Sequence, residues 1–88
     1  MSYREKCIIE IIVKARKKDI DKTKALIKNS RWQVIEKRTD TPTILICTKE
    51  IELWEIERSI NDIKFYAPKI LSVIVEFAGQ KLQISEVF

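Results

Sequence analysis

The chain has 88 residues, of which 45% are hydrophobic and 34% charged, with a net charge of +4 and no histidine. These values predict one globular domain over residues 1–88 and exclude a disordered chain. No apolar run approaches the roughly 20 residues of a membrane span, and the N-terminus lacks a signal-peptide core, so we expect a cytoplasmic protein that contacts no membrane.

The charge is unevenly distributed along the chain. Residues 1–49 hold 13 Lys and Arg but 6 Asp and Glu, a net +7, whereas residues 50–88 hold 4 and 7, a net −3; together these give +4. A basic half beside an acidic half indicates a side that faces a polyanion, head-to-tail self-association, or an ordinary solvated surface.

The first predicted element is a strand over Lys6–Lys14, because this stretch is rich in β-branched residues and bounded by charge. Alternate side chains point to opposite faces of a strand. One face is wholly apolar and carries Cys7, Ile9, Ile11 and Val13. The other face is mixed and carries Lys6, Ile8, Glu10, Ile12 and Lys14. This pattern predicts a central strand with helices packed on its apolar face.

A helix is predicted next, after the basic connector Ala15–Lys18. Asp19 stands at the expected N-cap, and Asp21 places a negative charge in the first turn. The helix should end near Asn29 or Ser30, since Asn and Ser favour helix ends over helix interiors.

Two strands follow, the second over Trp32–Arg38 and the third over Thr43–Cys47, joined as a hairpin by a turn at residues 39–42. The second strand is the less apolar and is expected nearer an edge. The third is apolar on both faces and is expected in the centre of the sheet.

Thr48 is predicted to cap a second helix, with Glu50 and Glu52 in its first turns and an apolar stripe ending at Ile63. Pro68 requires this helix to end before it. A fourth strand over Ile70–Ala78 and a fifth over Lys81–Phe88 should form a hairpin. Gly79 and Gln80 would connect them in a type II′ turn.

The resulting order, βαββαβ with an added C-terminal hairpin strand, resembles the ferredoxin-like fold. The resemblance is one of element order only and covers nearly the whole chain. It implies an α+β sandwich with two helices on one face of an antiparallel sheet and the first and third strands at its centre. Such a fold serves many unrelated functions.

The sheet face without helices is the first candidate site. Its predicted protein-interface residues are Ile8, Glu10, Ile12, Ile74 and Glu76, with Lys6 and Lys14 around them. Aliphatic side chains from adjacent strands would form one patch, which usually marks an interface. The alternative is scattered surface aliphatics that need no explanation. The fifth strand could extend the sheet, close an edge or cross to another subunit.

A basic cluster is the second candidate, for nucleic acid or an acidic partner. It consists of Lys14, Arg16, Lys17, Lys18, Lys22, Lys24 and Lys28. No base-reading motif accompanies it, and the aromatic residues do not converge on the central strands as they do in RNA-recognition domains. A solvated helix face is the alternative.

The two cysteines and a group of glutamates are the remaining candidate sites. Cys7 and Cys47 would lie near each other if the first and third strands are antiparallel, but two buried thiols in a reducing compartment are the simpler interpretation. Glu50, Glu52, Glu55 and Glu57 would form a solvated acidic helix face. With no histidine and one glycine, we expect no enzyme, no metal and no cofactor.

The sequence therefore predicts a small non-enzymatic module that acts by protein–protein contact, as an adaptor, an inhibitor or an accessory subunit. We expect it to form a homodimer through the uncovered sheet face. The alternative is a nucleic-acid-associated protein that uses the basic cluster.

Overall fold

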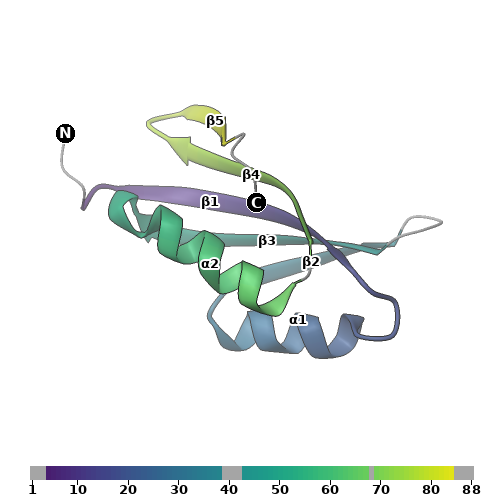
Figure 1. The fold of residues 1–88 in the computed structure, drawn as a ribbon. Coiled ribbons are helices and arrows are strands. Elements are labelled where there is room, and N and C mark those ends of the chain that lie inside the picture. Colours follow the sequence, from purple (N-terminus) through teal and green to yellow (C-terminus); the bar gives the residue numbers. More distant parts are fainter. Residues whose placement is uncertain (1–3, 39–42, 68, 85–88) are drawn as a thin grey trace.

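The structure is a computed structural model that describes residues 4–38, 43–67 and 69–84. Over these ranges the chain is a small α+β fold, with two α-helices and a five-stranded antiparallel sheet (Figure 1). The elements in chain order are β1 (Lys6–Ala15), α1 (Ile20–Asn29), β2 (Gln33–Arg38), β3 (Thr43–Glu52), the 3₁₀ turn η1 (Leu53–Glu55), α2 (Ile56–Tyr66), β4 (Lys69–Phe77) and β5 (Gln80–Ile84).

The strands are arranged in the order β2-β3-β1-β4-β5. β1 pairs with β3 on one side and with β4 on the other, and all pairings are antiparallel. The two strands with the most apolar sequences therefore lie side by side in the interior of the sheet. β2 is at one edge, as its more polar sequence predicts.

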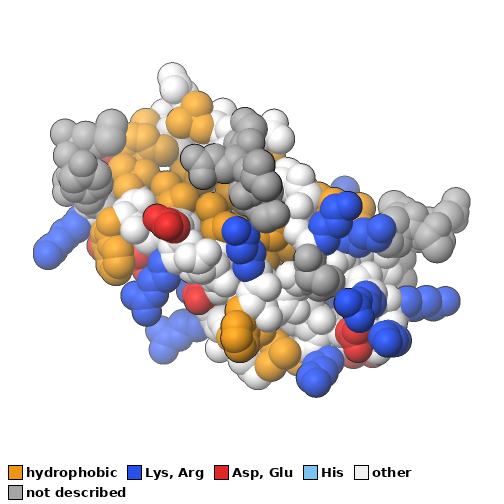
Figure 2. Space-filling model, viewed as in Figure 1, with side chains coloured by type: hydrophobic (Ala, Val, Ile, Leu, Met, Phe, Trp, Pro, Cys, Tyr) orange, Lys and Arg blue, Asp and Glu red, His pale blue; other side chains and the backbone are white. Residues whose placement is uncertain are grey.

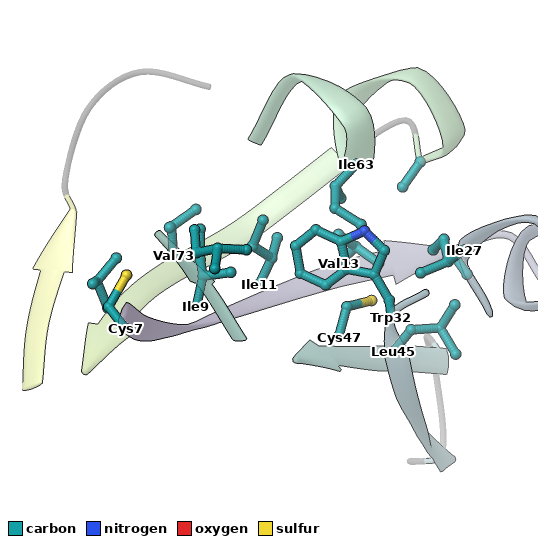
Figure 3. Close-up of a cluster of buried hydrophobic side chains, with 14 of the residues drawn as sticks. Cys7, Ile9, Ile11, Val13, Ile27, Trp32, Leu45, Cys47, Ile63 and Val73 are labelled. Carbon is teal, nitrogen blue, oxygen red and sulfur yellow. The ribbon is translucent and has the colours of Figure 1, made fainter. Parts of the chain in front are cut away.

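Both helices lie on one side of the sheet and bury its apolar face (Figure 1). On β1 the buried side chains are Cys7, Ile9, Ile11, Val13 and Ala15. They meet Ile27 of α1 and Ile63 of α2, and the Trp32 ring lies among Val13, Cys47 and Ile63 (Figure 3). Burying one such aliphatic side chain stabilises the fold by about 1.5–3 kcal/mol, so the alternation within β1 fixes which face carries the helices.

Polar contacts join the ends of the two helices. The Ser30 hydroxyl donates to the Tyr66 hydroxyl at 3.0 Å, and Lys49 Nζ donates to the Ser30 carbonyl at 3.2 Å. Asp19 occupies the N-cap position of α1, but its side chain makes no capping hydrogen bond. Its backbone, at ψ 0°, lies outside the β region that N-cap residues usually adopt, so the expected cap through its carboxylate is not formed.

β3 is longer than the sequence prediction, which ended it at Cys47 and began a helix at Thr48. The segment Thr48–Glu52 instead pairs with Lys6–Glu10 of β1. Ile51 stands opposite Cys7 and is buried. The strict polar–apolar alternation of Glu50, Ile51 and Glu52 is typical of a strand, and pairing along the whole of β1 prevails over the capping preference of Thr48.

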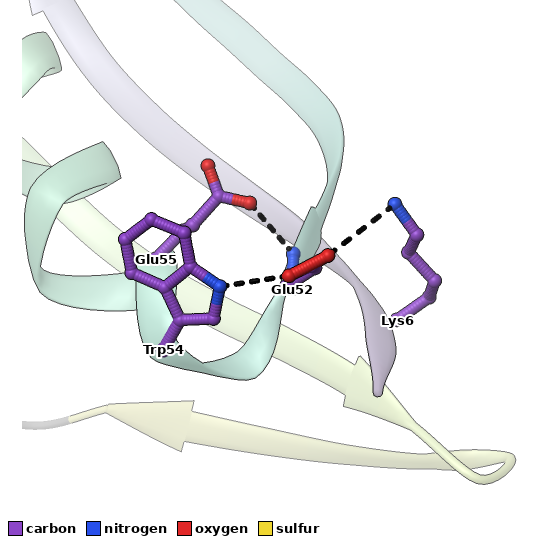
Figure 4. A network of polar contacts seen from close by, with 4 residues as sticks. All are labelled: Lys6, Glu52, Trp54 and Glu55. Atoms are coloured by element: carbon purple, nitrogen blue, oxygen red, sulfur yellow. Dashed lines mark hydrogen bonds and ion pairs between the residues drawn. The ribbon is translucent and has the colours of Figure 1, made fainter. Parts of the chain in front are cut away.

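Glu52 and Glu55 organise the start of the second helical segment in place of Thr48 (Figure 4). The Glu52 backbone N–H donates to Glu55 Oε1 at 3.1 Å. The Glu52 carboxylate accepts a hydrogen bond from Trp54 Nε1 at 2.8 Å and lies 4.0 Å from Lys6 Nζ. A further backbone bond, from Leu53 N–H to the Glu5 carbonyl, ties this turn to the beginning of β1.

The β4–β5 turn falls one residue earlier than predicted. Its central residues are Ala78 and Gly79, with φ of 52° and 77°, and Phe77 pairs with Gln80. Positive φ at both central positions is typical of a type I′ turn, whereas the expected type II′ turn has positive φ at the first central position only.

The pairing of β1 with β4 is irregular between Ile12 and Val13. Ile12 stands opposite Ser72 and Val13 opposite Ile70, so Leu71 is the extra residue of a bulge and is exposed. Uninterrupted alternation along this strand would place Leu71 on the same face as Val73, but the bulge breaks the alternation and Ile70 packs against the core instead.

β5 extends the sheet beyond β4 within the same chain. It covers Gln80–Ile84, so the last four residues of the predicted fifth strand lie outside the described residues, as does the turn at 39–42.

Candidate interaction surface

We call the side of the sheet opposite the two helices the open face. Its side chains form rows across the hydrogen-bonded strands, because residues directly opposite each other in a sheet point to the same side. The lysine row is Lys37, Ile44, Lys14 and Lys69. The isoleucine row is Ile35, Ile46, Ile12 and Ser72. The Glu10 row is Gln33, Thr48, Glu10, Ile74 and Gln83, and the Glu50 row is Glu50, Ile8, Glu76 and Lys81.

The isoleucine row is the apolar centre of this face. Ile35, Ile46 and Ile12 come from three neighbouring strands, so their Cβ atoms follow one another at about 4.5–5.5 Å. Ile35 is 59% exposed, and Ile46 and Ile12 are half-buried by their neighbours. Ile44 and Ile74 flank the row on either side. No described helix covers these side chains, so they form a continuous aliphatic strip open to solvent.

Charge on the open face is divided by the isoleucine row. The lysine row on one side carries Lys37, Lys14 and Lys69 and no carboxylate. The Glu10 and Glu50 rows on the other side carry three carboxylates, those of Glu10, Glu50 and Glu76, and the single ammonium of Lys81. Beyond these rows the Lys6–Glu52 pair adds one charge of each sign. The face is therefore basic at one end of its strands and carries a net negative charge towards the other.

All five residues predicted for the protein interface lie on this face. Ile12 belongs to the isoleucine row, Glu10 and Ile74 to the next row, and Ile8 and Glu76 to the row beyond it. Ile8 is 45% exposed between Glu50 and Glu76.

The sequence interpretation missed the contributions of β2 and β3. It did not place Ile35, Ile44 or Ile46 on the open face, and it assigned Glu50 to a helix. The alternation of Ile44, Ile46, Thr48 and Glu50 was the signal that could have found this set, since it continues at period two through the whole of β3.

The structure disperses the basic cluster. Lys14 points to the open face, whereas Arg16, Lys17 and Lys18 lie in the exposed β1–α1 connector. Lys24 pairs with Glu36 of β2 at 3.5 Å. Lys22 and Lys28 remain exposed on α1. The predicted cluster is thus split between two sides of the molecule.

A groove lies between the start of α1 and the end of α2. It places two residues of the basic cluster beside residues of α2 that the sequence analysis did not connect with that cluster. Arg16 and Lys22 line it together with Lys64, Phe65 and Tyr66. Phe65 is 85% exposed and stands edge-on to Tyr66, with 5.4 Å between the ring centroids. Asp19 also lines the groove, so its lining is mainly, but not wholly, basic.

A second apolar surface lies on the helix side, beside α2. Leu82 of β5 stands opposite Val75 and is 59% exposed, and Ile84 stands opposite Val73. Figure 2 shows hydrophobic side chains gathered over β4 and β5, and Lys and Arg side chains around the junction of β1 and α1. The apolar surface arises because β5 extends the sheet past the area that the two helices cover.

Cys7 and Cys47 are free, buried thiols. The sequence predicts that they are neighbours, but they are not. Cys47 stands opposite Ile11, and Cys7 opposite Ile51, which separates the two by about 13 Å along the strands. Figure 3 shows isoleucine side chains between them. Burial raises the pKa of the Cys47 thiol to about 12 and also raises the pKa of Cys7, with a smaller contribution from the negative charge of Glu55.

The four carboxylates predicted on one helix face are separated. Glu50 and Glu52 belong to β3, Glu55 to η1, and Glu57 is exposed on α2. In the described part of the chain, no three Cys, Asp or Glu side chains gather in a way that could hold a metal ion. Nor is any helix in those ranges long and apolar enough to cross a membrane.

Comparison of the chain with known proteins gives no relative from which a role could be transferred: no family model, no curated protein and no solved structure matches it.

Proposed function

We propose that this protein is a non-enzymatic binding module that self-associates through its open face, as an adaptor, an inhibitor or an accessory subunit of a larger assembly. The observation that carries the proposal is the isoleucine row, in which three neighbouring strands present isoleucine to solvent at the same level of the sheet. Contiguous apolar patches of this kind usually mark contact surfaces.

The size of the open face suits a protein partner. β1 and β3 are ten residues long, and β2 and β4 flank them. At about 3.3 Å per residue and about 4.8 Å between strands, the face presents roughly 600 Å² per copy. Stable interfaces bury about 800 Å² per partner, so contact over this face would approach a standard interface.

We also infer that the fold is a ferredoxin-like sandwich with β5 added at one edge. The supporting observations are the central position of β1 and β3, the sequence β2-β3-β1-β4 across the sheet, and the position of both helices on one side. In such an arrangement the open face is the surface available for contact, since the helices cover the other side.

Sedimentation of two matched variants tests self-association. Ile35→Glu places a charge on the open face, and Leu82→Glu places one on the helix side. Both residues are 59% exposed on edge strands, so neither change disturbs the core. We expect the wild-type protein to form dimers at protein concentrations between ~1 and ~100 µM. Ile35→Glu should raise the dimer dissociation constant at least tenfold, because it buries a charge, and Leu82→Glu should leave that constant unchanged.

Two results would contradict the proposal. A wild-type protein that sediments as a monomer at ~100 µM would exclude self-association in this range. A dimer disrupted by Leu82→Glu but not by Ile35→Glu would move the contact to the surface beside β5. Circular dichroism melts of the three proteins would establish that each is folded.

The second candidate function is binding of single-stranded nucleic acid, favoured by the groove between α1 and α2. There Arg16, Lys22 and Lys64 lie near an 85% exposed Phe65. Cations that follow a phosphate backbone, together with an exposed aromatic ring on which a base can stack, are typical of such sites.

A filter-binding titration with a ~20-nucleotide single-stranded RNA at two salt concentrations tests this candidate. Phe65→Ala should weaken binding about tenfold, as expected for loss of one stacked base, and Lys22→Glu should also reduce the salt dependence. Lys81→Glu, on the open face, is the control. Equal binding by all four proteins would refute the groove as the site.

A further inference from the structure

We infer that the second copy docks with its strands running antiparallel to those of the first, related by a two-fold axis that lies along the isoleucine row. This inference rests on the proposed self-association and adds its geometry. It follows from the division of charge on the open face, which the row separates into a basic and an acidic part.

Two symmetric arrangements place open face against open face with the strands of the two sheets aligned, because the two-fold axis between the sheets can then run along the strands or across them. An axis along the strands lays the lysine row of one copy over the lysine row of the other, and carboxylates over carboxylates. An axis across the strands lays the lysine row over the Glu10 row. Like charges opposed at an interface cost free energy and opposite charges steer association, so the second arrangement is selected.

The position of the axis follows from the order of side chains on β1. Glu10, Ile12 and Lys14 are successive open-face residues of this strand. An axis at Ile12 stacks Ile12, Ile46 and Ile35 on their own copies. It places Lys14 about 7 Å to one side and Glu10 about 7 Å to the other, so each Lys14 faces the Glu10 of the second copy. The contact occurs twice in the dimer.

A charge-swap series tests this orientation. Lys14→Glu faces carboxylate with carboxylate, and Glu10→Lys faces ammonium with ammonium, so each single variant should weaken the dimer about tenfold at low salt. The double variant, Lys14→Glu with Glu10→Lys, restores opposite charges and should associate within about threefold of wild type. Dissociation constants come from sedimentation at ~20 and ~300 mM NaCl, and the differences should shrink at the higher salt.

Recovery in the double variant would report on contact between copies and not within one chain. Glu10 and Lys14 are four residues apart on an extended strand, about 13 Å along it, well beyond the roughly 4 Å of a direct ion pair. At ~300 mM NaCl this separation also exceeds the screening length, so recovery that persists there excludes an interaction within one chain. Circular dichroism melts should show that all four proteins are folded, and Lys14→Glu should not lower the Tm, since Lys14 stands opposite Lys69.

The outcomes separate this inference from the proposed function. If Ile35→Glu disrupts the dimer but the single charge variants do not, or if the double variant fails to recover, the antiparallel orientation is wrong while self-association through the open face stands. If wild-type dimers tighten as salt is added, the copies oppose like charges and the orientation is again wrong. If the wild-type protein is monomeric, both the antiparallel orientation and self-association through the open face are wrong.

Discussion

Cys47 illustrates how one residue responds to the sheet around it. It lies on β3 opposite Ile11, fully enclosed by the core, with no counter-charge to stabilise a thiolate. Desolvation disfavours the charged form and raises its pKa to about 12. Cys7 lies on the same face of the sheet, near the start of β1, and burial raises its pKa as well. Both thiols are therefore protonated at neutral pH and act as small apolar core residues.

This environment predicts a loss of stability at alkaline pH. The unfolded thiol titrates near its ordinary pKa of 9.0, but the folded one near 12, so the folded state retains the proton that the unfolded state releases. Stability is complete below pH 9 and falls as the pH rises towards 12. Between pH 8 and pH 10.5, wild type should lose about 2 kcal/mol more than Cys47→Ala in urea unfolding.

Subtracting the slope of Cys47→Ala removes the contributions of every titratable group that the two proteins share. Equal pH slopes for the two proteins would show that the Cys47 thiolate is tolerated in the folded state. The absolute stability of Cys47→Ala will be lower because of the cavity it leaves, so only the slopes are compared.

At the scale of the element, the junction between β3 and α2 shows a local signal overridden by pairing. Thr48 is a good N-cap residue, yet its segment continues as a strand because Lys6–Glu10 of β1 needs a hydrogen-bonding partner. The helical segment starts only after Glu52, where the Glu52 N–H donates to the Glu55 carboxylate. The cap at Glu52 therefore lies four residues further along the chain than Thr48, the position that the sequence indicates.

Removal of this hydrogen bond should destabilise the fold. Glu55→Ala is expected to lower the free energy of unfolding by about 1 kcal/mol, as for other lost helix caps. Glu55→Gln keeps an acceptor and should lose less. Glu57→Ala is the matched control, since Glu57 is exposed in the first turn of α2 and the described part of the chain shows no side-chain cap for this helix. Similar losses in Glu55→Ala and Glu57→Ala would assign the effect to helix-dipole charge alone.

At the scale of the whole molecule, folding changes a charge difference along the chain into one across a surface. The basic N-terminal half supplies Lys14 and Lys37, but Lys69 in the lysine row comes from the acidic half. Likewise Glu10 comes from the basic half and lies in the row next to that of Glu50 and Glu76. The division of charge by the isoleucine row, on which the dimer orientation depends, therefore has no counterpart in the net charges of the two halves.

Site residues could be recognised in the sequence where alternation within one strand was enough to place them. Ile8, Ile12 and Ile74 were assigned to the open face from alternation within single strands, a property of consecutive residues. Ile35 and Ile46 join Ile12 only through the register of β2 with β3 and of β3 with β1. The groove that contains Arg16 and Phe65 likewise depends on how the two helices meet.

The sequence by itself determined the kind and order of the elements, the apolar face of β1 and the need for helices over it, because period and propensity are set by neighbouring residues. Tertiary structure alone decided the length of β3, the bulge at Leu71 and the rows of the open face. These depend on which residues of distant strands pair, and that choice is made by burying the most apolar surface and satisfying the most backbone hydrogen bonds over the whole sheet.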